Sequence, residues 1–300
     1  MKKKEIESIY KKKLKKFHEH SKSYYEKNNP IITDADFDHL KKEILELENR
    51  YVFLKSSDSP SKVVGFKPSK NFEKIKHKVP MLSLGNAFNE QDLINFEKKI
   101  FNFLSLDDSS IIDYSAEPKI DGISASLIYI NGKFIKGLSR GDGAEGEDIT
   151  ENLKTIKDIP LNIIEKNFPN EIDIRGEVFI ENDDFKKISE KFANPRNAAS
   201  GSLRQKNPLA TTKIPLKFIA YTYGYASDMK IYNQTTFLEN LKAWGFKTNP
   251  LNKKISGIKN LMLNHKSLEE KRKEIAFDVD GVVYKVNDFS LQKRLGFAAN

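Results

Sequence analysis

Cysteine is absent from the 300-residue chain, which excludes disulfide bonds and cysteine-ligated zinc sites. The five histidines show no metal-ligand spacing. No apolar run approaches the roughly 18 residues of a membrane-spanning helix. The basic N-terminus, MKKKEIESIYKKK, also lacks the apolar segment of a secretory signal. We therefore expect a cytoplasmic protein that makes no contact with a membrane.

The phosphate-binding sequence G-x-x-x-x-G-K-[ST] of common ATPases is missing as well. The stretch RGDGAEG does contain G-x-G-x-x-G, at Gly141, Gly143 and Gly146. A Rossmann loop must join a strand to a helix in a parallel unit, whereas the strand before Gly141 belongs to a predicted antiparallel hairpin. This context argues against a dinucleotide site of the Rossmann type.

Basic residues outnumber acidic ones by 51 to 42, which gives a net charge of +9 and a pI near 9.2. Such an excess permits an anionic partner, either nucleic acid or a nucleotide. A Lys- and Asn-rich composition that comes from AT-rich coding would produce the same excess. Hydrophobic residues make up 38% of the chain, enough for a folded core.

Two amphipathic helices are predicted at the N-terminus. Apolar spacing of three and four marks one helix from Ile6 to Tyr24, which stops before Pro30. The second helix follows a Thr33 cap and carries Phe37, Leu40, Ile44, Leu47 and Tyr51 on one face. A short turn between them predicts an antiparallel pair. A loop rich in Ser, Pro and Lys follows, so we expect domains at 1–68 and 69–300.

The second domain alternates strands with short helices. SASLIYI, Asn131-Gly132 and KFIKGLS predict a β-hairpin with a type I′ turn. EIDIRGEVFI, LKFIAYTYGYA and FDVDGVVYKV predict further strands, and helices are predicted over 183–192, capped by Asn182, and over 236–244. The pattern indicates an α+β fold in which helices flank antiparallel sheets.

The stretch AEPKIDGIS carries the most informative chemistry. In an extended strand, Glu117, Lys119 and Asp121 share one face. A lysine becomes a nucleophile only when burial or neighbouring cations favour its free amine, and flanking carboxylates oppose this. A reactive Lys119 therefore needs a divalent metal or arginines nearby. The alternative is a salt-linked surface patch.

Other polar residues fall on predicted strands and loops. Arg175 and Glu177 share a strand face away from Ile174, and Lys285 lies on an otherwise apolar strand face, where an anionic partner would offset its burial. FANPRNAASGSLRQ is read as a loop that carries Arg196 and Arg204. Phosphate binding would account for Lys285, Arg196 and Arg204. The alternatives are that Lys285 reaches solvent along its long side chain and that the two arginines belong to an ordinary basic loop.

Taken in order, seven stretches resemble the NAD+-dependent DNA ligases of bacteria. They are YYEKNNPIITDADFDHL, VPMLSLGNAF, EPKIDG, SRGDGAEGEDIT, IRGEVF, NPRNAASGSLRQ and DGVVYKV. K-x-D-G alone indicates a covalent nucleotidyltransferase, which includes ATP-dependent enzymes. The helical stretch and S-L-x-N-A-F are typical of the NAD+ users. The resemblance implies a helical hairpin module followed by a nucleotidyltransferase domain with the DNA-ligase-like (ATP-grasp) fold.

The resemblance also implies roles for individual residues. Lys119 would attack the α-phosphate of NAD+, release nicotinamide mononucleotide (NMN) and retain AMP, with Mg2+ or Mn2+ as the metal. Glu117 would bind the adenine, and Lys285 would meet the nucleotide from the opposite sheet. The remaining nucleotide contacts would come from Asp121, Arg140 and Glu177 on the ribose and phosphate side, from Ser83 and Leu84 at the adenosine, and from Tyr24, Tyr25, Asp34, Ala35, Asp36, Phe37 and Asp38 at the NMN half.

Two departures from the family pattern stand out. Phe37 occupies a position where the family usually has tyrosine, which removes a hydroxyl from the NMN side. The family continues past LGFAAN into a further lysine motif, an OB-fold, a zinc module, helix-hairpin-helix repeats and a BRCT domain. We therefore expect a monomeric adenylation fragment that seals nicked double-stranded DNA poorly without the rest of the enzyme. The other hypotheses are an ATP- or GTP-using nucleotidyltransferase and a non-catalytic nucleic-acid-binding protein.

Overall fold

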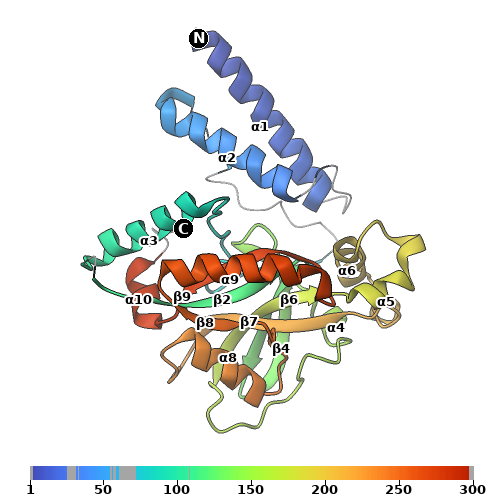
Figure 1. The fold of residues 1–300 in the computed structure, drawn as a ribbon. Helices are drawn as coiled ribbons and strands as arrows, with labels where there is room; N and C mark the ends of the chain where they lie inside the picture. The colour runs from blue at the N-terminus through green and yellow to red at the C-terminus, as the bar shows by residue number, and fades with distance from the viewer. Residues whose placement is uncertain are drawn as a thin grey trace. The chain divides into compact units, whose positions relative to one another are not determined.

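The computed structural model describes residues 3–25, 32, 34–54, 56, 59–60, 72–107 and 109–296. The chain divides into two compact units, one formed by 1–83 with 140–148 and the other by 84–139 with 149–300. The two units are described separately below. Helices combine with antiparallel sheets, so the predicted α+β class is confirmed (Figure 1).

The first unit contains the predicted helical pair, α1 (Lys3–Tyr25) and α2 (Asp34–Arg50), followed by the short helix η1 (Val52–Leu54). Their contacts run in opposite directions along the chain, from Tyr10 with Glu48 to Phe17 with Phe37. The pair is therefore antiparallel, as predicted. Its core contains the predicted apolar stripe, namely Ile6, Tyr10, Leu14, Phe17, Phe37, Leu40, Ile44, Leu47 and Tyr51. Thr33 and Pro30 lie outside the described residues.

A two-stranded ribbon belongs to the same unit. β1 (Lys74–Lys76) pairs antiparallel with β5 (Glu145–Glu147), far along the chain. The Gly-rich stretch forms the turn before β5, with Gly141 at φ 58° and Gly143 at φ 91°. A Cβ at Gly141 would lie 1.9 Å from the carbonyl oxygen of Glu145, so only glycine fits this turn.

The second unit contains a four-stranded antiparallel sheet in the order β4-β3-β6-β7. β3 (Ile123–Ile130) and β4 (Lys133–Ser139) form the predicted hairpin, and positive φ at Asn131 and Gly132 matches a type I′ turn. β6 (Glu171–Phe179) and β7 (Lys217–Ala226) complete the sheet. One face carries the main core, which includes Leu127, Ile172, Ile174, Val178, Phe218 and, from α8 (Gln234–Ala243), Phe237 and Leu241.

A three-stranded antiparallel sheet has the order β8-β2-β9, with bounds Lys253–Ser256, Asp113–Ile120 and Val279–Val286. A second hydrophobic core lies at this sheet. Helices α3 (Glu90–Leu104), α9 (Ile258–Lys271) and α10 (Phe289–Leu295) contribute Ile100, Leu261 and Leu295, which cluster with Tyr114 of β2. Figure 1 shows α9 lying along this sheet. The opposite face of β2 carries Ser115, Glu117 and Lys119, because strand residues alternate between faces.

Short helices complete the second unit: α4 (Thr150–Leu153), α5 (Asn182–Lys186), η2 (Ser189–Lys191), α6 (Pro195–Leu203), α7 (Pro208–Thr211) and η3 (Arg272–Glu274). The helix predicted over 183–192 is broken into α5 and η2, and Glu181 rather than Asn182 stands at its N-cap. The helix predicted over 236–244 begins two residues earlier, after an Asn233 cap.

The loop expected around Arg196 was a wrong prediction. Residues Pro195–Leu203 form α6, whose Asn194 cap accepts a hydrogen bond from the backbone N–H of Asn197. An Asn cap followed by proline at the first helical position is a favoured helix start. Arg196 therefore projects from the first turn of a helix, and Arg204 is its C-cap.

Among the helices that the structure describes, none combines the length and the apolar composition needed to cross a bilayer.

Candidate active site

Lys119 is close to the end of β2 and pairs with a carboxylate on β9. Its Nζ lies 2.5 Å from Oδ2 of Asp280. Lys119 pairs with Gly281 and Ile120 pairs with Val279, so Asp280 is the extra residue of a β-bulge. The bulge interrupts the strand alternation at this point of β9 and brings the Asp280 carboxylate to Lys119.

Opposing influences act on the Lys119 amine. Desolvation lowers the pKa of Lys119, but the charge and hydrogen bond of Asp280 raise it, and the net shift of the pKa is upward. The positive charge of Arg196 opposes Asp280 and lowers this pKa, while the charge of Glu177 raises it. The side chain is 43% exposed. Lys119 is therefore held as an ammonium that solvent can still reach.

Glu177 faces the same group of charges from β6. Oγ of Ser124, its cross-strand neighbour, donates a hydrogen bond of 2.9 Å to Oε2 of Glu177. Burial raises the pKa of Glu177 to about 7, although Arg196, Ser124 and Lys119 act to lower it. A carboxyl group with a pKa near neutrality can hold or release a proton at physiological pH.

Asp121 is placed differently from the prediction. β2 ends at Ile120, so the strand alternation that aligns Glu117 with Lys119 does not extend to Asp121. The Asp121 carboxylate instead accepts a hydrogen bond of 2.6 Å from Arg196 of α6. A Cβ at Gly122 would lie 2.4 Å from the carbonyl oxygen of Val178, so this glycine permits the close approach of β6.

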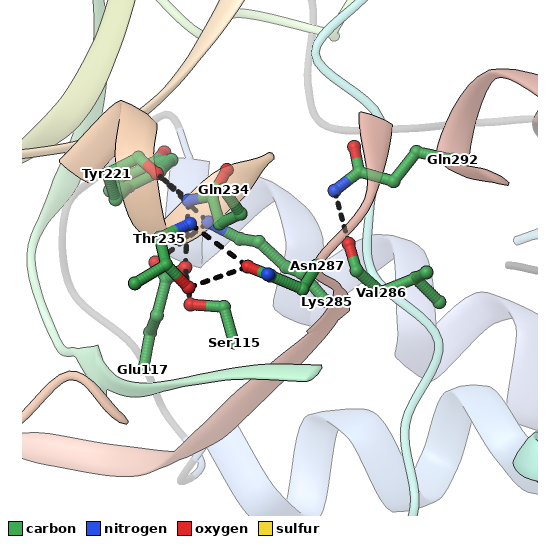
Figure 2. A network of polar contacts seen from close by, with 9 residues as sticks. All are labelled: Ser115, Glu117, Tyr221, Gln234, Thr235, Lys285, Val286, Asn287 and Gln292. Carbon is green, nitrogen blue, oxygen red and sulfur yellow. Dashed lines mark hydrogen bonds and ion pairs between the residues drawn. The ribbon is translucent and has the colours of Figure 1, made fainter. Parts of the chain in front are cut away.

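Glu117 is buried and accepts hydrogen bonds from three side chains within the described part of the chain. Oε1 receives Ser115 Oγ at 2.9 Å and Gln234 Nε2 at 2.8 Å, and Oε2 receives Lys285 Nζ at 2.8 Å. Figure 2 shows these residues converging from β2, β9 and α8. The anionic partner expected for Lys285 is therefore Glu117, and Ser115 faces Lys285 across the two strands.

Tyr221 of β7 completes this arrangement. Arg175 pairs with Thr222 and Gly176 pairs with Ala220, so Tyr221 is the extra residue of a second bulge. Its carbonyl oxygen accepts hydrogen bonds from Gln234 Nε2 at 2.7 Å and from Lys285 Nζ at 3.1 Å. The Lys285 ammonium also lies 5.1 Å from the centre of the Tyr221 ring, within cation–π range.

A buried ion pair lies further along β6. Arg175 donates to Oδ2 of Asp173 through Nε at 3.2 Å and through a terminal nitrogen at 3.0 Å, and Ser126 donates to Oδ1 of Asp173. A Cβ at Gly224 would lie 2.2 Å from the Arg175 guanidinium, so the absence of a side chain there makes room for the pair. Arg175 and Glu177 share a strand face, as predicted, but Arg175 is engaged with Asp173.

Arg140 and Ser83 lie together in the first unit. The Arg140 guanidinium donates to the carbonyl oxygen of Met81 at 3.1 Å and to Oγ of Ser83 at 3.0 Å. The carbonyl oxygen of Arg140 lies 3.1 Å from Nε2 of the buried His77. Leu84, the next residue of the VPMLSLGNAF stretch, is exposed.

The residues expected at the NMN half are only partly described. Phe37 stacks on Phe17 with ring centroids 4.9 Å apart, inside the helical pair, and Asp36 is exposed. The side chains of Tyr24, Tyr25, Asp34, Ala35 and Asp38 lie outside the described part of the structure.

Comparison with known proteins identifies the family. A family model described as "NAD-dependent DNA ligase adenylation domain" matches residues 69–300. A second, described as "DNA ligase-like, N-terminal NAD+-binding domain", matches residues 3–65. The chain belongs to the NAD-dependent DNA ligase family.

Relatives named DNA ligase extend beyond this chain. One from Pelagibacter ubique (strain HTCC1062) is 76% identical over 297 residues, which cover 99% of this chain and 44% of the relative. One from Parvibaculum lavamentivorans is 46% identical and covers 93% of this chain and 41% of the relative. The chain thus spans less than half the length of these ligases.

The ligase domain contains further site residues that the sequence did not predict: Asp280, Tyr221, Gln234, Ser115 and Ser124. Asp280 and Tyr221 enter the site through bulges, which strand alternation does not reveal. Ser115 was detectable, because it stands two residues before Glu117 in the same predicted strand. Ser124 lies across from Glu177 only through the pairing of β3 with β6, which the sequence does not reveal. Gln234 is more than a hundred positions from Glu117 and carried no local signal.

Proposed function

We propose that this chain performs the adenylation step of an NAD+-dependent DNA ligase, with Lys119 as the nucleophile. Lys119 Nζ would form a bond to the α-phosphorus of NAD+, and the bond from that phosphorus to the bridging oxygen would break. The bonding electron pair leaves with NMN, and AMP remains on Nζ. The observation that carries the proposal is Lys119 held at 2.5 Å by Asp280 and within the electrostatic reach of Glu177 and Arg196.

The amine must lose one proton before the attack and a second afterwards. Oδ2 of Asp280 already accepts a hydrogen bond from Lys119 Nζ and is the nearest base. Cationic groups beside the amine favour its free form, and Arg196 acts in this direction. The same guanidinium can stabilise negative charge on the non-bridging phosphate oxygens in the transition state.

The remaining predicted contacts divide between base and sugar-phosphate. Glu117 and Lys285 offer an acceptor and a donor to the adenine, and the Tyr221 ring beside them offers a surface for stacking. Asp121, Arg140 and Glu177 would bind the ribose and phosphates, with Ser83 and Leu84 at the adenosine. The hydrogen bond from Arg140 to Ser83 supports a shared role for these two residues.

Mg2+ is expected to assist this step, with Mn2+ as a substitute. Within the described residues, no three His, Cys, Asp or Glu side chains gather as a metal site. Mg2+ commonly binds one or two carboxylates together with substrate phosphates, so a single carboxylate fits it. Oδ1 of Asp280 is buried and accepts no hydrogen bond from the residues that the structure describes, which makes Asp280 the best candidate ligand. The metal would neutralise phosphate charge.

Tyr24, Tyr25, Asp34, Ala35, Asp36, Phe37 and Asp38 would hold the NMN half. In-line displacement requires the leaving group opposite the nucleophile, so their contribution would be positioning. Phe37 already packs in the helical pair, which leaves stacking rather than a hydroxyl contact as its contribution. AMP would then pass to the 5′-phosphate of nicked double-stranded DNA during replication and repair. We expect this protein to act as a cytoplasmic monomer.

Intact-mass spectrometry tests the proposal. The purified chain is incubated with Mg2+ and either NAD+ or ATP, and we expect one AMP adduct from NAD+ alone. Lys119→Ala should abolish the adduct, whereas Lys186→Ala, at an exposed lysine, should preserve it. An adduct from ATP would indicate an ATP-dependent transferase instead. Nucleotide binding without any adduct would contradict the proposed chemistry and favour a non-catalytic binding protein.

A further inference from the structure

The contacts of Gln234 close a ring of hydrogen bonds around the Glu117 carboxylate. Gln234 Nε2 joins Oε1 of Glu117 to the carbonyl oxygen of Tyr221, and Lys285 Nζ joins Oε2 of Glu117 to the same carbonyl oxygen. We propose that Gln234 is a positioning residue that fixes Glu117 relative to Lys285, and so lets the site distinguish 6-amino from 6-oxo purines. This role rests on the proposed adenine contact of Glu117.

The ring uses both N–H donors of Gln234 and part of the acceptor capacity of Glu117. A glutamine amide nitrogen has two N–H donors, and Gln234 uses one on Glu117 and the other on Tyr221. A carboxylate has about four acceptor positions. Among the residues that the structure describes, Oε1 of Glu117 receives both Ser115 and Gln234, whereas Oε2 receives Lys285 alone. Further acceptor capacity therefore remains on Oε2, the oxygen beside the lysine.

The bulge at Tyr221 makes the ring possible. The extra residue of a bulge is left out of the regular ladder, so its carbonyl oxygen can accept other donors. The ring consequently connects β7 of the four-stranded sheet with β2 and β9 of the three-stranded sheet (Figure 2). It fixes the spacing between the two sheets at the place where Glu117 and Lys285 face β7.

The backbone of Gln234 is anchored as firmly as its side chain. Gln234 is fully buried, and its backbone N–H donates to the carbonyl oxygen of Asn287 at 2.8 Å. The next residue, Thr235, donates to Oδ1 of Asn287 through its backbone N–H at 3.0 Å and its hydroxyl at 2.7 Å. The start of α8 is thereby tied to the residues that follow β9, so Gln234 reaches Glu117 from a fixed position.

The fixed pair matches one kind of purine edge. An acceptor beside a donor complements adenine, whose 6-amino group donates and whose neighbouring ring nitrogen accepts. A 6-oxo purine presents the reverse order, with an oxygen acceptor beside a ring N–H. Glu117 and Lys285 would discriminate between these edges only while they keep their places. If the Glu117 side chain were free to rotate away, Lys285 could donate a hydrogen bond to the 6-oxo group.

Calorimetric titration of AMP and IMP into the intact chain tests this role without requiring catalysis. Gln234→Met keeps the size of the side chain but removes both donors, and Gln234→Glu keeps the shape but replaces the donor with an acceptor. The matched control is Gln292→Met, because Gln292 donates to the carbonyl oxygen of Val286 at 2.7 Å and touches neither Glu117 nor Lys285 (Figure 2). Circular dichroism establishes that each variant is folded.

We expect the wild type and Gln292→Met to bind AMP at least about tenfold more tightly than IMP. Both Gln234 variants should reduce this ratio by about tenfold, the effect of one buried hydrogen bond. Equal losses for AMP and IMP would show a merely structural role and overturn the inference, as would a wild type that binds neither nucleotide. If the chain formed no AMP adduct from NAD+ but still bound AMP more tightly than IMP, only the proposed function would be overturned.

Discussion

Nζ of Lys119 and Oδ2 of Asp280 form a 2.5 Å ion pair between the end of β2 and a bulge in β9. This ion pair keeps the Lys119 amine protonated as long as no other cation competes for the Asp280 carboxylate. A cation that bound Asp280 would free Lys119 from this partner, and the same event would place positive charge beside the amine. Metal binding and activation of the nucleophile are therefore expected to be coupled.

Asp280→Asn should make the Lys119 amine more reactive in the absence of nucleotide and metal. The variant removes the largest influence that raises the pKa of Lys119 and leaves desolvation and Arg196, which lower it, against Glu177, whose charge has a smaller raising effect. Labelling with a water-soluble succinimidyl ester at pH 8, read by peptide mass spectrometry, should rise several-fold at Lys119. In the control, Asp183→Asn, labelling of its exposed partner Lys186 should change little, because solvent already screens that pair. Unchanged labelling of Lys119 would contradict the role of Asp280.

Glu177→Gln should stabilise the protein at high pH only. The folded-state pKa of about 7 lies above the ordinary 4.5, so the folded protein favours the protonated carboxyl. Wild-type stability should fall as pH rises from about 4.5 to about 7, and the loss should be complete above that range. We expect the variant to melt about 2–4 °C higher at pH 8 and at nearly the same temperature as the wild type at pH 4. Thermal denaturation at both pH values, with the exposed Glu151→Gln as control, measures this, and a pH-independent difference would refute it.

Gly224→Ala should destabilise the four-stranded sheet. A new Cβ would lie 2.2 Å from the Arg175 guanidinium and 2.3 Å from Oδ2 of Asp173, so a buried ion pair would have to separate. We expect a loss of about 2–4 kcal/mol in the free energy of unfolding, measured by urea denaturation. Gly201→Ala in α6, where the nearest atom is 4.0 Å away, should be neutral or stabilising by up to about 1 kcal/mol. Equal effects of the two substitutions would show that the ion pair tolerates the side chain.

Tyr10→Phe should loosen the helical pair. The Tyr10 hydroxyl donates to Oε1 of the buried Glu48 at 2.6 Å, and Ser59 donates to the other oxygen at 2.7 Å. Loss of one donor to a buried carboxylate costs about 1–3 kcal/mol. Hydrogen exchange of the amides in α1 and α2 should accelerate, whereas Tyr232→Phe, at an exposed tyrosine, should leave exchange unchanged. Unaltered protection in Tyr10→Phe would argue that Ser59 alone satisfies Glu48.

Removal of divalent metal should abolish the AMP adduct on Lys119. The α-phosphate carries negative charge that a metal neutralises, and the described residues form no cluster of three metal-ligating side chains, so we expect the metal to enter with the nucleotide. Chelation with EDTA should stop adduct formation from NAD+, and added Mg2+ or Mn2+ should restore it, as read by intact mass. Full adduct formation in EDTA would exclude the metal from the step.

Local sequence pattern predicted much of the fold. The apolar stripes of α1 and α2 and the Asn131-Gly132 hairpin depend on neighbours within a few residues, and both are confirmed. Strand alternation likewise predicted that the side chains of Glu117 and Lys119 share one strand face. Local pattern does not predict α9, and the small residues around Asn194 and Pro195 favour a loop where the structure has the start of α6.

The rest of the site depends on departures from regular geometry. Asp280 and Tyr221 are placed by bulges, and a bulge shifts the alternation from which a strand face is inferred. Gln234 reaches Glu117 only after two sheets and α8 have assembled. Such placements are properties of the folded protein, since the sequence around Asp280, Tyr221 or Gln234 does not specify which residue each one contacts.

The ribbon of β1 and β5 constrains how the protein can be divided for experiments. A truncated chain beginning at residue 84 would retain β5 but lose β1, and every backbone pairing of Glu145–Glu147 with Lys74–Lys76 would go with it. The unpaired edge of β5 would then be available to pair with other molecules, and the resulting aggregation would be mistaken for instability of the domain. Expression boundaries should therefore fall before residue 72.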